Sequence, residues 1–287
     1  MAATTAGNTT YIHINNHDLY YDDMGKSDIP IIFLHGFPFD KSMWQNQMNY
    51  FKTKCRVLAY DIRGFGQSVD TESALSIDMF ANDLMAFMDA LQLKKAVICG
   101  LSMGGYIALQ AVAKAPERFE ALILCDTQCI ADTPEVKENR YKTIACIENG
   151  GLKAFYEGFI KKVFHEDALT HKKAVVAQLS EVVDNNDVQS IKQGLMALAE
   201  RSETCSILSN LSLDTLILCG RQDAVTPLSE SEKMHAAIHG SALRVIENAG
   251  HVSNLEQPEA FNAYLLGFLK TLPGLDLEHV RDDVGMV

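Results

Sequence analysis

The sequence lacks several features that mark whole classes of protein. None of its apolar runs approaches the roughly 18 consecutive residues that a membrane-spanning helix needs. Its opening residues, MAATTAGNTTYIHINN, have neither the basic nor the apolar region of a cleaved signal peptide. Lysine and arginine form no run of five or more, and the formal net charge of −12 would repel nucleic acids and anionic membranes. We therefore expect neither a nucleic-acid partner nor a membrane partner.

Metal-binding and redox motifs are missing as well. The seven cysteines include no CxxC pair, and the nine histidines do not cluster with the spacing of metal ligands, so the sequence predicts no metal site and no cofactor. Three cysteines lie inside apolar runs, AVICG, LILCD and LILCG, as buried thiols usually do. We interpret the odd set as buried, reduced thiols of a cytoplasmic protein. They are Cys55, Cys99, Cys125, Cys129, Cys146, Cys205 and Cys219.

What the sequence does contain is a series of short apolar runs, which are typical of buried parallel strands. Amphipathic helical patterns lie between several of them, such as residues 76–91, where Ser76 or Asp78 is placed to cap the helix. This alternation favours an α/β fold with a mostly parallel central sheet flanked by helices, preceded by an antiparallel hairpin at residues 9–25. The apolar runs are 29–36, 55–61, 95–100, 120–126, 214–220 and 243–248.

One interval interrupts the alternation of strands and helices. From about Gln128 to Leu211 the sequence has helical patterns and no convincing strand, which predicts a helical cap inserted into a single α/β domain. The cap would fall between the fourth and fifth of the apolar runs, close to the strand ends that carry sites in such folds. The predicted division is a core at 1–127 and 212–272, a cap at 128–211 and a C-terminal tail at 273–287.

Residues 100–104 read Gly-Leu-Ser-Met-Gly, and they follow an apolar run and precede a helical pattern. A nucleophile elbow needs a strand, a sharp turn and a helix in this order. The glycines let strand and helix approach closely, while the turn holds Ser102 in a strained conformation that exposes its hydroxyl. Ser102 is therefore the predicted nucleophile. A phosphate-binding loop is excluded because the pattern GxxxxGK[ST] is missing.

With these motifs, the sequence resembles the α/β-hydrolase superfamily over about residues 10–270, in particular its capped carboxylesterase and 3-oxoadipate enol-lactonase-like group. The resemblance implies the α/β-hydrolase fold and the chain order nucleophile, acid, histidine. It assigns the acid to Asp223, in RQDAVTP, and the general base to His251, in NAGHVSNLEQPEAF. Asp126 stays open as the alternative acid, because in some relatives the preceding strand supplies it.

The resemblance also implies an oxyanion hole. The loop from His35 to Pro38 resembles the family's oxyanion loop, so the backbone N–H groups of Phe37 and Met103 would bind the tetrahedral oxyanion. We interpret His35 as a structural hydrogen-bonding residue rather than a second base. Four further residues are candidates for lining an acyl pocket, although core packing explains each of them at least as well. They are Trp44, Phe155, Phe159 and Met196.

A serine at the elbow predicts acyl transfer. Epoxide hydrolases and haloalkane dehalogenases of this superfamily attack through an aspartate at that position, whereas a serine forms an ester intermediate. The sequence therefore predicts a carboxylesterase-type serine hydrolase that cleaves small to medium acyl groups from an ester or lactone substrate. Lactonase, cofactor-free perhydrolase and carbon–carbon bond hydrolase activities stay open, because pocket shape separates them. A small-molecule receptor of the same fold is the non-enzymatic alternative.

Overall fold

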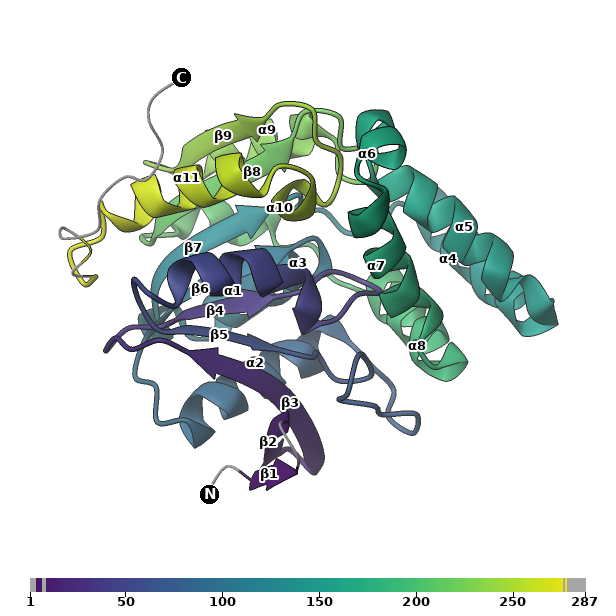
Figure 1. The fold of residues 1–287 in the computed structure, drawn as a ribbon, viewed down its shortest axis with the longest axis horizontal. Coiled ribbons are helices and arrows are strands. Elements are labelled where there is room, and N and C mark those ends of the chain that lie inside the picture. Colours follow the sequence, from purple (N-terminus) through teal and green to yellow (C-terminus); the bar gives the residue numbers. More distant parts are fainter. Residues whose placement is uncertain (1–3, 7–8, 276, 278–287) are drawn as a thin grey trace.

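The computed structural model describes residues 4–6, 9–275 and 277, and a nine-stranded sheet forms its centre (Figure 1). Within these residues the strand order is β1-β2-β3-β5-β4-β6-β7-β8-β9. The strands from β5 and β4 through β9 pair in parallel, whereas β1, β2 and β3 pair antiparallel and β3 joins β5 antiparallel. The strands are β1 (Thr4–Ala6), β2 (Thr9–Ile14), β3 (His17–Met24), β4 (Ile31–Leu34), β5 (Val57–Tyr60), β6 (Ala96–Leu101), β7 (Phe119–Cys125), β8 (Asp214–Gly220) and β9 (Ala242–Ile246).

The six apolar runs of the sequence form β4 to β9, and the predicted hairpin is β2 with β3. Every residue of β4, β5 and β6 is buried, because helices cover both faces of the sheet at these strands. In β3, by contrast, buried residues alternate with more exposed ones over most of the strand, as expected where one face meets solvent. The predicted α/β fold with a mostly parallel sheet is therefore confirmed.

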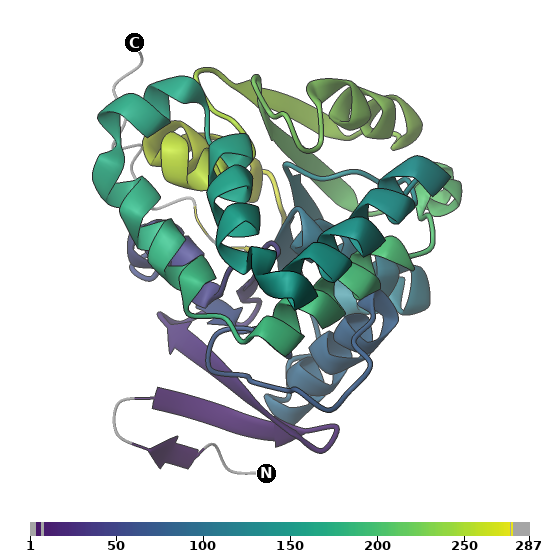
Figure 2. The same ribbon diagram turned by 90° about the vertical axis from the view of Figure 1, so that its right-hand side faces the viewer.

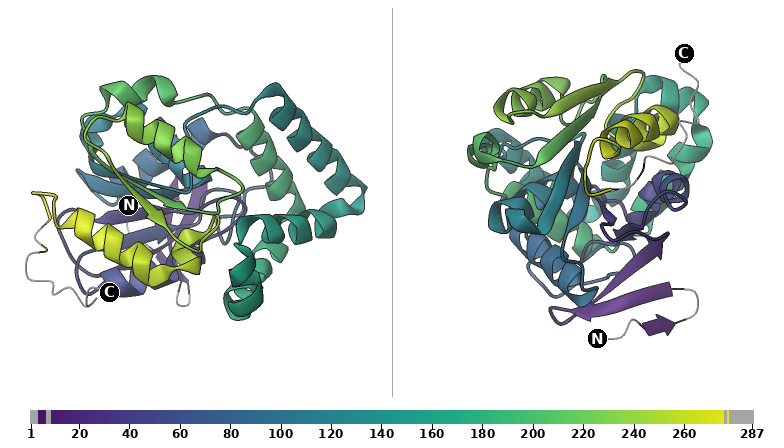
Figure 3. Two further views of the ribbon diagram at one scale, coloured as in Figure 1. Left: turned by 90° about the horizontal axis from the view of Figure 1, so that it is seen from above. Right: turned by 90° about the vertical axis from the view of Figure 1, so that its left-hand side faces the viewer.

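Helices pack on both faces of the sheet. α1 and α11 lie on one face, and α2, α3 and α9 lie on the other (Figures 1 and 3). Ser76 rather than Asp78 caps α2, because the Ser76 hydroxyl oxygen accepts the N–H of Met79. In the described part of the chain, no helix is both long and apolar enough to cross a membrane. The helices of the core are α1 (Gln45–Phe51), α2 (Ile77–Ala90), α3 (Met103–Lys114), α9 (Leu228–Ala237), α10 (Ser253–Glu256) and α11 (Pro258–Leu269).

Five further helices form an insertion between β7 and β8, and they lie beside the core in Figure 1 and in front of it in Figure 2. The insertion contacts loops of the core at the strand ends. The side chain of Asn186, in the insertion, donates to the carbonyl oxygen of Pro38 at 2.7 Å. The carbonyl oxygen of Val163, also in the insertion, accepts the N–H of His251 at 2.8 Å. The helices that the sequence predicts here are present, whereas their role as a cap and the limits at 128 and 211 stay a prediction. Its helices are α4 (Pro134–Cys146), α5 (Leu152–Val163), α6 (Glu166–His171), α7 (Lys173–Asp184) and α8 (Val188–Ala199).

The expectation that all seven cysteines are buried and reduced is wrong at three positions. Cys129 and Cys205 form a disulfide that joins the two ends of the insertion, and Cys146 is exposed. The spacing gave no sign of this pair, because 76 residues separate the two cysteines. Disulfides persist mainly in oxidising compartments, so the bond removes the cysteine argument for a cytoplasmic protein. The buried free thiols are Cys55, Cys99, Cys125 and Cys219.

The predicted C-terminal tail, 273–287, lies outside the described residues apart from 273–275 and 277. Within this short described part, Leu275 and Leu277 are buried and belong to the hydrophobic core. The chain therefore still packs against the core at residues 275 and 277, inside the predicted tail.

Reduction of the Cys129–Cys205 disulfide is expected to lower the free energy of unfolding by about 4 kcal/mol, because the bond closes a long loop and removes conformational entropy from the unfolded chain. Urea unfolding of the oxidised and the reduced protein measures this difference. A Cys129→Ser, Cys205→Ser double variant should unfold like the reduced protein whether or not reductant is present. Equal unfolding free energies for all three samples would contradict the prediction.

Candidate active site

Ser102 lies in the sharp turn between β6 and α3. Its backbone has a φ of 53° and a ψ of −114°, and such a positive φ costs a residue with a side chain about 1–3 kcal/mol. The turn closes because Gly100 and Gly104 have no side chains: a Cβ on Gly100 would lie 2.2 Å from the carbonyl oxygen of Gly104. The strained turn that the sequence predicts around Ser102 is therefore present.

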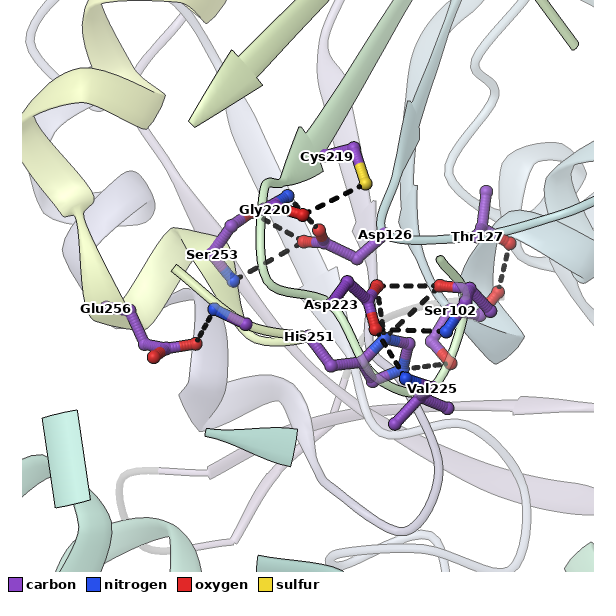
Figure 4. A network of polar contacts seen from close by, with 12 residues as sticks. Ser102, Asp126, Thr127, Cys219, Gly220, Asp223, Val225, His251, Ser253 and Glu256 are labelled. Carbon is purple, nitrogen blue, oxygen red and sulfur yellow. Dashed lines mark hydrogen bonds and ion pairs between the residues drawn. The ribbon is translucent and has the colours of Figure 1, made fainter. Parts of the chain in front are cut away.

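The Ser102 hydroxyl meets an imidazole from the loop after β9 (Figure 4). Ser102 Oγ lies 2.8 Å from His251 Nε2, and His251 Nδ1 lies 2.8 Å from Asp223 Oδ2. An ionised carboxylate only accepts hydrogen bonds, so Nδ1 carries the hydrogen and Nε2 is left to accept the hydrogen of Ser102. The structure thus brings the predicted nucleophile, base and acid together, although they lie on three separate loops.

Donors from its own loop hold the Asp223 carboxylate. Oδ1 accepts the N–H groups of Val225 at 2.7 Å and Thr226 at 2.9 Å, and Oδ2 accepts the Thr226 hydroxyl at 2.8 Å. Burial raises the pKa of Asp223, but the neighbouring His251 and these hydrogen bonds outweigh burial and hold the pKa below its usual value. Asp223 is therefore ionised at neutral pH. The sequence analysis did not identify Thr226 as a residue that holds Asp223. Its position three residues after an aspartate in a loop is typical of such hydrogen bonding and could have indicated this role.

Asp126, the alternative acid, forms its described side-chain hydrogen bonds with Gly220 and Ser253 and not with His251. Oδ1 accepts the N–H of Gly220 at 2.7 Å, and Oδ2 lies 2.5 Å from the Ser253 hydroxyl oxygen. Burial and the nearby charge of Asp223 raise the pKa of Asp126 well above its usual value. Asp126 therefore links the ends of β7 and β8 to α10, and the geometry favours Asp223 as the partner of the imidazole.

The loop after β4 lies directly beside the elbow. A Cβ on Gly36 would lie 3.3 Å from the Cβ of Ser102. Met103 is the first residue of α3, and the first N–H groups of a helix have no partner within the helix. The backbone N–H groups of Phe37 and Met103 therefore belong to the two segments that flank Ser102. Donors placed in this way can stabilise negative charge on a carbonyl oxygen.

Both ring nitrogens of His35 have partners in the same region. Nδ1 donates to the carbonyl oxygen of Gly36 at 2.8 Å, and Nε2 accepts the N–H of Ile62 at 2.9 Å. Burial lowers the pKa of His35, which keeps the ring neutral. These bonds agree with a structural role for His35, because a general base needs a free nitrogen.

Two of the four candidate pocket residues lie on α5, and one of them, Phe159, reaches the loop after β4. The ring centroid of Phe159 lies 6.3 Å from that of Phe37 and 5.8 Å from that of Phe39. Phe155, one turn earlier on the helix, lies 5.8 Å from Phe159. The insertion therefore brings aromatic rings to the side of the loop that flanks Ser102.

Trp44, the third candidate, belongs to the core instead. Its side chain is fully buried, and its ring centroid lies 4.9 Å from that of Phe33 and 5.9 Å from that of Phe261. The prediction of a pocket role is therefore wrong for Trp44. Its place after the oxyanion loop suggested the site, but the chain turns the ring toward α11.

The fourth candidate, Met196, lies on the far side of α8. Gly194 faces the site, because a Cβ on it would lie 2.7 Å from the ring of Phe37 and 2.8 Å from the ring of Phe65. A residue two positions later points about 200° away around the helix, and Met196 is 40% exposed. The prediction is therefore wrong for Met196. The sequence also gave no sign that Gly194 and Phe65 meet Phe37.

One group of possible metal ligands occurs within the described residues. Ligand atoms of Asp126, Cys219 and Asp223 lie within 4.8 Å of one another, and all three side chains are buried. Burial raises the pKa of the Cys219 thiol, which keeps it protonated. Metal binding needs a deprotonated thiolate, so this group is a poor site for a metal ion.

Comparison with known proteins gives the chain a family. A family model described as alpha/beta hydrolase fold matches residues 29–258. The 3-oxoadipate enol-lactonase 2 of Acinetobacter baylyi is 31% identical over 245 residues, which cover 85% of this chain and 90% of that protein.

Solved structures agree with this match. The thermophilic esterase of Thermogutta terrifontis has a TM-score of 0.88 and 31% identity, over 93% of this chain and 99% of that chain. The enol-lactonase of Burkholderia xenovorans has a TM-score of 0.84 and 25% identity, over 91% of this chain and 99% of that chain. The chain therefore belongs to the alpha/beta hydrolase superfamily, in which it is enol-lactonase-like.

Proposed function

We propose that the protein is a serine hydrolase that cleaves carboxylic esters of small to medium acyl groups. The observation that carries the proposal is the pair of 2.8 Å contacts from Ser102 to His251 and from His251 to Asp223. A serine hydroxyl is a poor nucleophile until an imidazole takes its proton, and a carboxylate must fix the tautomer of that imidazole. The family and its esterase and enol-lactonase members support a hydrolase.

In the proposed mechanism, His251 Nε2 takes the proton of Ser102 while Ser102 Oγ attacks the carbonyl carbon of the ester. The N–H groups of Phe37 and Met103 stabilise the tetrahedral oxyanion. His251 then gives its proton to the leaving alcohol, and the acyl group stays on Ser102 as an ester. Finally, the same imidazole takes a proton from water, which attacks the acyl group, releases the acid and restores the serine.

The aromatic rings near the elbow support an uncharged acyl group. The ring centroid of Phe37 lies 5.8 Å from that of Phe65 and 6.3 Å from that of Phe159. Gly194 packs directly against two of these rings, which limits the space beneath α8. Aromatic rings bury acyl carbons well and do not compensate the loss of hydration of a charged group.

Lactone hydrolysis is the second candidate, and the 31% identity to an enol-lactonase favours it. A lactone is a cyclic ester, so the same attack by Ser102 opens the ring. The leaving alcohol then stays attached to the acyl group instead of diffusing away. The two candidates therefore share one mechanism and differ in the shape of the substrate.

A substrate panel tests the proposed function. We expect multiple turnovers on p-nitrophenyl acetate and butyrate, with kcat/KM falling for longer acyl chains as the space beneath α8 fills. Lactones of matched carbon number belong in the same panel, and a higher kcat/KM on them would select the second candidate. Stoichiometric binding without turnover on every compound would contradict an enzyme and support a receptor.

A further inference from the structure

A further carboxylate, that of Glu256, lies beside the loop that carries His251. This loop, residues 247–252 between β9 and α10, is called the histidine loop below. Glu256 ends α10 and is fully buried. Its Oε1 accepts the N–H of Gly250 at 2.8 Å, and its Oε2 accepts the N–H of His165 at 2.8 Å (Figure 4 includes Glu256). Gly250 directly precedes His251, whereas His165 belongs to the insertion. One carboxylate therefore binds the histidine loop and the insertion at the same time.

Further contacts hold these two segments against each other. The N–H of His251 donates to the carbonyl oxygen of Val163 at 2.8 Å. A Cβ on Gly250 would lie 2.8 Å from that same oxygen, so no space is left between the segments. The Lys172 ammonium donates to the backbone carbonyl oxygen of Glu256. The histidine loop therefore sits on the insertion through backbone contacts, with the Glu256 side chain between them.

The chemistry of the contact requires an oxygen at both positions of the Glu256 side chain. Burial raises the pKa of Glu256, and the N–H groups of His165 and Gly250 oppose that shift. An N–H group can only donate, so an amide nitrogen in place of either oxygen would face a donor with a donor. A buried donor without an acceptor is unfavourable, and the two segments would move apart to relieve it.

The same part of the insertion also reaches the proposed acyl site. α5 ends at Val163, two residues before His165, and Phe159 lies one turn earlier on that helix. The Phe159 ring packs near Phe37 on the oxyanion loop. A single helix therefore connects the aromatic rings beside Ser102 with the residue that bonds to Glu256.

We propose that Glu256 is a positioning residue that keeps His251 Nε2 aligned with Ser102 Oγ by tying the histidine loop to the insertion. This inference rests on the function proposed above. Glu256 acts through the backbone of Gly250 and does not touch the reacting atoms. A misplacement of about 1 Å can cost a catalytic site on the order of 100-fold, so loss of the tie is expected to lower kcat by about 10- to 100-fold. KM should change less than kcat, because Phe37 and Phe65 belong to loops of the core and not to the insertion.

Two variants break the tie from opposite sides. Glu256→Gln keeps the shape of the side chain and replaces one acceptor by a donor. His165→Pro removes the N–H on the insertion side, and its ring displaces the carboxylate oxygen. The backbone accepts this proline, because His165 has a φ of −65° and the preceding Phe164 is extended, with a φ of −93° and a ψ of 144°.

Two matched controls separate the tie from other effects. His165→Ala removes the imidazole and keeps the N–H that bonds to Glu256. Glu259→Gln removes an exposed carboxylate three residues further along the chain. We expect both controls to keep the wild-type kcat. Glu256→Gln is close to isosteric, so it keeps the comparison intact if the proline variant does not fold.

The rate at which a fluorophosphonate labels Ser102 reports on serine activation and needs no natural substrate. We expect Glu256→Gln and His165→Pro to be labelled about 10- to 100-fold more slowly than wild type. Their kcat, calculated per mole of Ser102 that the fluorophosphonate can label, should fall by a similar factor. Labelling and turnover equal to those of His165→Ala would overturn the proposal. A lower melting temperature with an unchanged rate per titrated site would also overturn it, by showing a merely structural role. Failure of the proposed function is distinct, because wild type would then turn over no ester while the labelling rates could still be compared.

Discussion

Replacing Ser102 by alanine is expected to lower kcat on p-nitrophenyl butyrate by a factor on the order of 10⁶, the scale seen when a triad nucleophile is removed. The substitution removes the oxygen that would carry the acyl group. The residual rate would come from substrate binding and from the N–H groups beside the elbow. Initial rates of purified wild-type and Ser102→Ala protein measure the loss.

The matched control for this prediction is a buried serine away from the elbow. Ser231 lies in α9 and is fully buried. Ser231→Ala should keep the wild-type kcat, which shows that removing a buried hydroxyl does not itself abolish turnover. If Ser102→Ala retained most of the activity, another residue would have to carry the acyl group.

The second large effect is expected at the acid. Asp223→Asn should lower kcat by a factor of about 10⁴, because an amide can donate to His251 Nδ1 and thereby hold the wrong tautomer. In that tautomer Nε2 carries the hydrogen and cannot accept the proton of Ser102. The lowered pKa of Asp223 indicates that the native side chain is a carboxylate at neutral pH, so the substitution changes its charge.

Asp126→Asn is the matched variant, and it is expected to cost far less activity. An amide can keep two of the three described side-chain contacts of Asp126, since its oxygen accepts the N–H of Gly220 and its NH₂ group donates to the Ser253 hydroxyl. It gives up only the long contact, 3.4 Å, from the Ser253 N–H to Oδ2. The pKa of Asp126 is raised by burial and by Asp223, whereas that of Asp223 is lowered, so the surroundings of Asp126 oppose its negative charge more than those of Asp223 do. Values of kcat/KM for both variants on one ester decide the matter, and equal losses would contradict the assignment of Asp223.

The sequence predicted those parts of the molecule whose signals are local. Helices cover both faces of the sheet, so consecutive residues of each core strand are buried and apolar. A short apolar run in the sequence therefore predicts such a strand. The elbow is similarly local, since glycines at 100 and 104 flank a serine between a strand and a helix. The resemblance then placed Asp223 and His251, which composition and periodicity alone leave unassigned.

The parts that the sequence did not predict depend on contacts between distant segments. Cys129 and Cys205 are 76 residues apart, and their spacing matches no disulfide pattern. The side of α8 that meets the oxyanion loop depends on how the insertion packs, which is why Met196 rather than Gly194 was expected at the site. The contact of Glu256 with His165 joins residues 91 positions apart in the chain, so no local pattern indicates it.

Mass spectrometry of the fluorophosphonate adduct identifies the nucleophile. Protein is labelled until ester hydrolysis stops, then digested, and the modified residue is located by fragmentation. We expect a single adduct on Ser102, formed in step with the loss of activity, because only the serine that His251 contacts is activated. An adduct on a different residue, or full activity in protein whose Ser102 is modified, would contradict this expectation.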